Sequence, residues 1–175
     1  MAWSTYLMGG VGGVGALLAF CAVALPSSRR VERSGFVPAA PEQVFQLLSS
    51  TEGFQSFNPY KDEEPDLKIT PFGPRAGVGA GFGFEGKSTT GTQTILAMEA
   101  NRLVTMEIDL GAMGKPIQTF AVSADNGGSR VVWSTHSAFG FNPIARIFGF
   151  FLDGMLGPTY ERGLANLAKV AARPS

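Results

Sequence analysis

Hydrophobic and polar residues alternate along Val31–Val37, and the period then changes to that of a helix. The alternation predicts a short strand. Pro38 and Pro41 follow; neither can donate to a strand ladder, and Pro41 suits the first turn of a helix. Apolar residues within Val44–Leu48 then fall at helical spacing. A strand, a proline corner and an amphipathic helix together are typical of the beginning of a domain.

Further strands are predicted in the stretches that follow, which are separated by turns rich in Gly, Pro and Asn. These stretches are Leu67–Thr70, Gly79–Lys87, Gly91–Met98, Leu103–Leu110, Pro116–Ala124 and Ser129–Phe139. Together with Val31–Val37 they give seven strands, mostly in hairpin order, and therefore an antiparallel sheet. The sequence between Leu110 and Pro116 fits either a turn or a longer loop.

The period of two within each strand places one apolar set of side chains on a single face of the sheet. The set comprises Phe82, Phe84, Val104, Met106, Ile108, Leu110, Phe120, Val122, Val131, Trp133 and Phe139. Charged residues such as Glu85, Glu107 and Arg130 fall on the opposite register. Thr135 and Ser137 are polar groups that the register assigns to the inner face. The pattern predicts an apolar, aromatic-rich lining.

A long helix is predicted at the C-terminal end of the chain. Asn142 is a suitable N-cap with Pro143 at the first helical position. Apolar residues from Ile144 to Met155 recur at helical spacing, and Gly157-Pro158 is expected to kink or interrupt the helix. The helix then resumes and stops before Pro174.

Two features lie between the first predicted helix and the second strand. Phe54, Phe57 and Tyr60 recur at three-residue spacing in a short helix or turn ended by Pro59, and core packing beneath the sheet is the favoured interpretation. The acidic run Asp62–Asp66 is interpreted as a solvated loop, because adjacent carboxylates alone do not supply the ligand geometry of a metal site.

The order of these motifs resembles the SRPBCC superfamily, the START-like and polyketide cyclase/dehydrase-like helix-grip proteins, which often begin V-x-R-S-x-x-I-x-A-P-P-E-x-V-F. The chain contributes to that pattern Val31, Arg33, Ser34, Val37, Ala39, Ala40, Pro41, Glu42, Val44 and Phe45. Gly77–Gly86, Ser129–Trp133 and Gly163–Lys169 are similar to later family motifs. The resemblance implies an α+β helix-grip fold, a seven-stranded antiparallel sheet wrapped around a long C-terminal helix.

The resemblance also implies a pocket for an apolar ligand between that helix and the sheet. Its expected lining is Phe82, Phe84, Val104, Met106, Ile108, Phe120, Val122, Val131, Trp133, Thr135, Ser137, Phe148 and Phe151. The resemblance offers a second interpretation of Phe54, Phe57 and Tyr60, as a gate at the pocket mouth, where relatives place similar residues. An ordinary packed core without a cavity is the alternative, since periodicity does not distinguish a lined pocket from filled space.

Catalysis is a second hypothesis, in which polar groups in the pocket move protons on a reactive chain. The candidates are Thr135, Ser137, Tyr60 and Tyr160, none with an evident base beside it. His136 is the only histidine, and the alternation places it outside the lining. Because the sequence shows no Ser-His-Asp order, metal-ligand cluster or phosphate-binding loop, no cofactor or metal is expected.

The N-terminal segment Tyr6–Leu25 is twenty uncharged residues long, about the length that crosses a hydrocarbon core. It predicts a single transmembrane anchor in residues 1–28, with the START-like domain in residues 29–175. A cleaved signal peptide is the alternative, because Ala22–Ala24 resembles a cleavage site. Arg29, Arg30 and Arg33 would keep the domain on the cytoplasmic side.

Small residues give the predicted membrane helix one thin face. They are Gly9, Gly12, Gly13 and Ala16, whose spacing lets two helix backbones approach closely. This face suggests a transmembrane partner subunit in a larger membrane complex, although Gly is also simply common in membrane helices. The formal net charge of the chain is +0, and acidic residues slightly outnumber basic ones after Gly35, so nucleic-acid binding is excluded.

The leading hypothesis from the sequence is a membrane-anchored protein that binds a lipid, isoprenoid, quinone or polyketide-like molecule. The apolar inner face, the family resemblance and the predicted anchor motivate it. An enzyme of the cyclase/dehydrase kind and an accessory subunit of a membrane complex are the alternatives.

Overall fold

The computed structural model of the chain describes residues 23–173. Its elements in chain order are β1 (Ser28–Val37), α2 (Pro41–Leu48), α3 (Thr51–Phe57), α4 (Tyr60–Glu63), β2 (Lys68–Phe72), β3 (Gly81–Glu85), β4 (Thr90–Glu99), β5 (Leu103–Asp109), the 3-10 turn η1 (Gly111–Met113), β6 (Ile117–Asp125), β7 (Gly128–Ala138) and α5 (Pro143–Ala171). The predicted anchor segment, apart from its last three residues, lies outside the described residues, and so do Gly9, Gly12, Gly13 and Ala16. Between residues 23 and 173, no helix combines the length and apolarity that a bilayer crossing requires.

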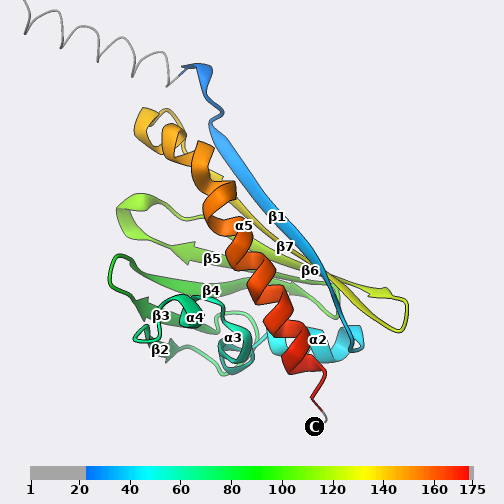
Figure 1. Ribbon diagram of the computed structural model, residues 1–175. Helices are drawn as coiled ribbons and strands as arrows, with labels where there is room; N and C mark the ends of the chain where they lie inside the picture. The colour runs from blue at the N-terminus through cyan, green and yellow to red at the C-terminus, as the bar shows by residue number, and fades with distance from the viewer. Residues whose placement is uncertain (1–22, 174–175) are drawn as a thin grey trace, which may run out of the picture.

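The seven strands form one antiparallel sheet in the order β1-β7-β6-β5-β4-β3-β2. The first strand therefore pairs with the last, and the others follow as a meander. Helix α5 lies across one face of this sheet and packs most extensively on β1 (Figure 1). The predicted α+β helix-grip fold is confirmed. Most strand bounds match the predictions within two residues, whereas β1 begins three residues earlier than predicted, at Ser28.

The strand–corner–helix start of the domain is confirmed as well. The N–H of Ala39 donates to the carbonyl of Val37 at 2.8 Å in the corner, and α2 begins with Pro41. Helix α2 buries Val44 and Leu48. The side chain of Ser50 then caps α3 by accepting a hydrogen bond from the N–H of Gly53 at 3.0 Å. These local signals place α3 under the sheet.

Helix α5 begins where its cap predicts. The side chain of Asn142 accepts hydrogen bonds from the N–H groups of Ile144 at 3.0 Å and Ala145 at 3.1 Å. The helix then continues without a break for 29 residues, with Pro158 inside it. Of the two predicted effects of Gly157-Pro158, a kink or an interruption, the interruption does not occur.

The contacts of Arg33 on β1 explain why α5 tolerates this proline. Proline removes one helical hydrogen bond, and tertiary contacts can offset that loss. The Arg33 guanidinium donates to Asp153 at 3.0 and 3.1 Å and to Glu161 at 2.8 Å, so it holds the turns before and after Pro158 on the same strand. A Cβ at Gly157 would overlap the guanidinium, so the glycine gives Arg33 its place against the helix.

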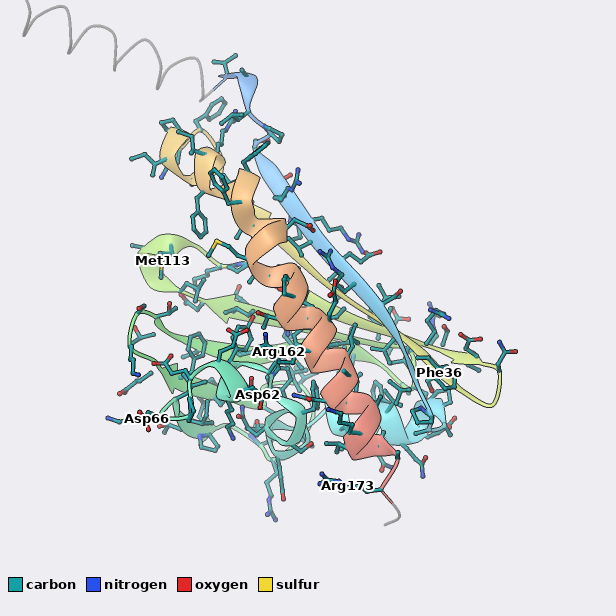
Figure 2. The ribbon with its side chains drawn as sticks, viewed as in Figure 1. Phe36, Asp62, Asp66, Met113, Arg162 and Arg173 are labelled. Atoms are coloured by element: carbon teal, nitrogen blue, oxygen red, sulfur yellow. The ribbon has the colours of Figure 1, made fainter. Side chains whose placement is uncertain are left out.

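The acidic run is largely exposed, as the interpretation of a solvated segment requires, but only part of it is a loop. Its first two residues, Asp62 and Glu63, belong to the short helix α4, and hydrogen bonds join them to side chains of α5; Figure 2 labels Asp62 and Arg162. Glu63 accepts hydrogen bonds from the hydroxyl of Thr159 at 2.7 Å and from Arg162 at 2.8 Å, and Asp62 accepts from Asn166 at 2.7 Å. The sequence pattern lacked any sign of these partners, which lie about a hundred residues away.

Candidate functional site

The concave face of the sheet and the C-terminal half of α5 enclose a core rich in aromatic residues. Trp133 on β7 lies opposite Phe120 on β6, with ring centroids 4.7 Å apart. On its other side Tyr160 of α5 stacks on the indole at 4.5 Å and 10°. A Cβ at Gly163 would overlap the Trp133 ring, so this glycine allows α5 to approach the sheet closely.

Most of the predicted lining residues converge on this core. The fully buried ones are Phe82, Val104, Met106, Phe120, Val122, Val131, Trp133 and Thr135. Phe84, Ile108 and Ser137 are half-buried. Phe148 and Phe151 lie apart from this set, because both are exposed on the N-terminal half of α5. That half of α5 is apolar on every side, so periodicity alone could not show which side faces the sheet.

One hydrogen bond joins α5 to the sheet inside the core. The hydroxyl of Tyr160 donates to the hydroxyl oxygen of Thr135 at 2.7 Å. Burial raises the pKa of Tyr160 to about 12, against a smaller lowering by the bond to Thr135. Burial also raises the pKa of Tyr60, helped by Tyr160 and Glu63. Both phenols therefore stay protonated at neutral pH and serve as hydrogen-bonding groups rather than bases.

Two buried glutamines complete the polar part of the core, and the sequence analysis missed both. Gln118 lies between Met106 and Thr135 in the strand register, and Gln93 lies opposite Ile108. Their side-chain amides both point to the sulfur of Met106, at 2.8 Å from Gln93 and 3.9 Å from Gln118. The signal was present, because Gln118 shares the register of Phe120 and Val122.

Two buried polar atoms in this core lack a hydrogen-bond partner in the described part of the chain: the carbonyl oxygen Oε1 of Gln118 and the indole Nε1 of Trp133. A buried polar atom left unpaired costs roughly 1–3 kcal/mol. One is an acceptor and the other a donor, so the core can pair with a ligand donor and with a ligand acceptor. With Thr135 and Tyr160 they form the polar cluster of the core.

The core contains a small cavity, and none of the four residues of the polar cluster lines it. A cavity of about 10 Å³ lies between α3 and β3, β4 and β5, and its lining includes Phe54, Phe82, Gln93 and Met106. That volume suits about one water molecule. Phe54 separates the cavity from the remaining aromatic rings, and its own ring lies 5.6 Å from that of Phe82. Core packing by Phe54 and Phe57, the favoured interpretation of their spacing, is confirmed.

The arrangement supports binding better than proton transfer. Among the described residues, the fully buried set contains no carboxylate and no histidine. His136 pairs with Arg30 across the strands and is exposed, on the register opposite to Trp133, as predicted. No group of three His, Cys, Asp or Glu residues in the described chain is placed to hold a metal ion. The core offers hydrogen bonds and apolar contact, without a base.

The sequence profile of the family described as "Polyketide cyclase / dehydrase and lipid transport" matches residues 28–172. No curated protein sequence matches the chain. Among solved structures, norcoclaurine synthase from Thalictrum flavum superposes with a TM-score of 0.63 at 14% identity, covering 89% of this chain and 92% of that one.

Two further solved structures share the fold. Ara h 8.0201 has a TM-score of 0.58 at 13% identity, with 81% of this chain and 99% of that chain covered. The di-domain aromatase/cyclase StfQ from the steffimycin biosynthetic pathway has a TM-score of 0.61 at 10% identity, with 82% of this chain and 50% of that chain covered. Identities this low establish the fold and leave the ligand open.

Proposed function

The chain belongs to the polyketide cyclase/dehydrase and lipid transport family, and on that premise we propose that it is a membrane-anchored protein that binds a hydrophobic small molecule between α5 and the concave face of the sheet. The single observation that carries the proposal is the polar cluster inside the aromatic core. Ligand sites are typically apolar with a few converging polar groups that fix orientation. The core of this chain has that composition.

The polar cluster narrows the chemistry of the ligand. Gln118 offers an acceptor and Trp133 a donor, both unpaired and buried. A hydroxyl or a protonated carboxyl group can donate to Gln118 or accept from Trp133, whereas an ionised group would lose its hydration without a countercharge. The proposed ligand therefore has a long apolar or aromatic body and one neutral polar end, as in an isoprenoid alcohol, a quinol or a phenolic polyketide.

Binding requires the core to open, because a cavity of about 10 Å³ holds no such molecule. Helix α3 is the element best suited to move. It is seven residues long and contributes Phe54 and Phe57 to the core. Displacing these two rings exposes Phe120 and Trp133, which both contact them. The ligand would replace aromatic contacts with its own.

Recovery of bound ligand tests this function. The full chain is extracted in mild detergent, mixed with a total lipid extract, re-isolated and analysed by mass spectrometry. The wild type is expected to retain one class of apolar molecule, and Gln118→Leu much less of it, because the acceptor is gone. Gln43→Leu, at an exposed position on α2, is the matched control. The proposal fails if no form retains an apolar molecule, or if Gln118→Leu retains as much as the wild type.

Turnover of the ligand is the second candidate function, favoured by the buried hydroxyl of Tyr160, whose ring stacks on Trp133. A protonated tyrosine can donate a hydrogen bond to a carbonyl oxygen of the ligand and so stabilise the negative charge that develops on that oxygen. Incubation with an aromatic polyketide and comparison of Tyr160→Phe with wild type separates the two functions. Product formed by wild type alone favours catalysis, and unchanged substrate that stays bound favours transport or storage.

Membrane attachment enters the proposal from the sequence. Tyr6–Leu25 would hold the domain at the bilayer where apolar ligands dissolve, with Arg29 and Arg30 keeping it on the cytoplasmic side. The small-residue face of Gly9, Gly12, Gly13 and Ala16 would pack against a partner helix. Replacing Gly9 and Gly13 by Leu is expected to preserve insertion and to lose any co-purifying subunit.

A further inference from the structure

A second apolar surface of the molecule faces outward, and the ligand core does not use it. On the N-terminal half of α5, Ile144, Phe148, Phe151 and Met155 recur at a spacing of four, three and four residues and so share one side of the helix. Their exposed fractions are 70%, 50%, 58% and 54%. These four residues form the α5 outer face, which extends about 17 Å along the helix.

The packing of this half of α5 leaves that face free. Gly149 is buried on another side of the helix, where a Cβ would overlap the ring of Phe139, and Leu152 is buried along the edge of the face, four residues after Phe148. Between His136 and Asp153 the sequence contains one charged residue, Arg146, and that residue is itself buried. A helix that is apolar all round belongs in a protein core or in a membrane. Here only one side has a protein neighbour among the described residues.

The end of the predicted membrane anchor is hydrogen-bonded to the same half of α5. Arg146 donates from Nη1 to the carbonyl of Leu25 at 2.8 Å and from Nε to the carbonyl of Gly140 at 2.7 Å. Two residues after Leu25, the carbonyl of Ser27 accepts a hydrogen bond from the N–H of Phe139 at 2.8 Å. Figure 1 shows the first described residues next to the beginning of α5. Leu25 is the last residue of the predicted anchor, so the anchor ends beside the first turn of α5, which also carries Ile144 of the outer face.

We infer that the α5 outer face inserts into the interfacial layer of the bilayer that the anchor crosses. This inference rests on the proposed anchoring, which brings the bilayer to Leu25. Large apolar side chains on one side of a helix bind the boundary of headgroups and acyl chains to a depth of about 5–10 Å. The absence of any carboxylate between Ala138 and Asp153 removes the repulsion that anionic lipids would otherwise exert.

The position of the face has a consequence for the ligand. Helix α5 is one continuous element, so its N-terminal half lies in lipid while its C-terminal half covers the polar cluster through Tyr160. Arg33 contacts α5 between the two halves, at Asp153 and Glu161. The bilayer would thereby fix the orientation of the helix that closes the ligand core.

Site-directed fluorescence in vesicles tests the inference on the full chain. The wild type carries one cysteine, Cys21, in the predicted anchor. In a Cys21→Ala background, Phe148→Cys and Phe151→Cys each introduce a single cysteine on the outer face. Val78→Cys is the matched control, because Val78 is an apolar residue that is 59% exposed and lies beside the end of α2. Each is labelled with an environment-sensitive dye and reconstituted in phosphatidylcholine with a minority of phosphatidylglycerol, with or without brominated acyl chains.

Dyes at positions 148 and 151 are expected to shift to the blue and to lose fluorescence in brominated vesicles, while the dye at position 78 does neither. A blue shift without bromine quenching shows that protein covers the face, as a second copy, a partner subunit or residues 1–22 would, and overturns the inference. No change at either position also overturns it.

The wild-type protein labelled at Cys21 separates this inference from the anchoring. Quenching at Cys21 without quenching at 148 and 151 leaves the anchor standing and overturns insertion of the α5 outer face. Quenching at 148 and 151 without quenching at Cys21 supports insertion and contradicts the transmembrane anchor.

Discussion

The N-terminal half of α5 is the more apolar of its two halves, yet it is also the more exposed. In the C-terminal half Tyr160, Leu164 and Leu167 are buried against the sheet. In the N-terminal half Phe148 and Phe151 point outward. The two halves differ in the protein surface that each one packs against. Glycines on α5 let it approach Phe139, Arg33 and Trp133, and that approach decides which side of the helix is buried. Apolar residues on the remaining side then need another explanation, which the proposed contact with lipid supplies.

The largest expected difference between the two halves is in folding stability. Leu167→Ala leaves a cavity in the core and is expected to lower the free energy of unfolding by about 2–5 kcal/mol. Phe151→Ala removes an exposed side chain and is expected to change it by less than about 0.5 kcal/mol. Urea titration of the full chain in mild detergent measures both. Equal losses would contradict the assignment of the outer face.

A second pair of variants tests the hydrogen bonding of the core beneath the C-terminal half of α5. Thr135→Val leaves the hydroxyl of Tyr160 buried without its acceptor and is expected to cost about 1–3 kcal/mol. Gln118→Leu removes an acceptor that is already unpaired, so stability should stay level or rise. Thermal melting of both variants beside Thr135→Ser, which keeps the hydroxyl, checks the pair. A Gln118→Leu protein less stable than Thr135→Val would show that the amide is satisfied.

The ion pairs at the junction of the halves give a smaller effect, which depends on pH. The hydrogen bond from Arg33 lowers the pKa of Asp153. A depressed carboxyl pKa stabilises the folded state above the unfolded pKa of about 3.9, and the contribution is lost as the pH falls through the folded value. Wild type should therefore exceed Asp153→Asn in melting temperature at neutral pH, and the gap should close in strong acid. A gap independent of pH would rule out this charge effect.

The sequence predicted the sheet well and the helix surroundings poorly, for a physical reason. Strand periodicity and turn residues are local, so they located the strands and assigned Trp133 and His136 to opposite faces. The partners of Glu63, and the tolerance of α5 for Pro158, depend on residues distant in the chain. Gln118 shows a different limit. Its register places it on the inner face, but a polar residue among apolar ones does not by itself indicate a lining position.

The central claim is that an apolar ligand with one neutral polar end bonds to the unpaired atoms of the core, and the indole of Trp133 reports on it directly. Trp3→Phe leaves Trp133 as the single tryptophan. The measurement is the NMR signal of its indole N–H, recorded on the delipidated chain in detergent before and after addition of total lipid extract. The account predicts a downfield shift, as the N–H gains an acceptor, and the shift should be absent in Gln118→Leu. An indole signal that does not move while the wild type binds lipid would contradict it.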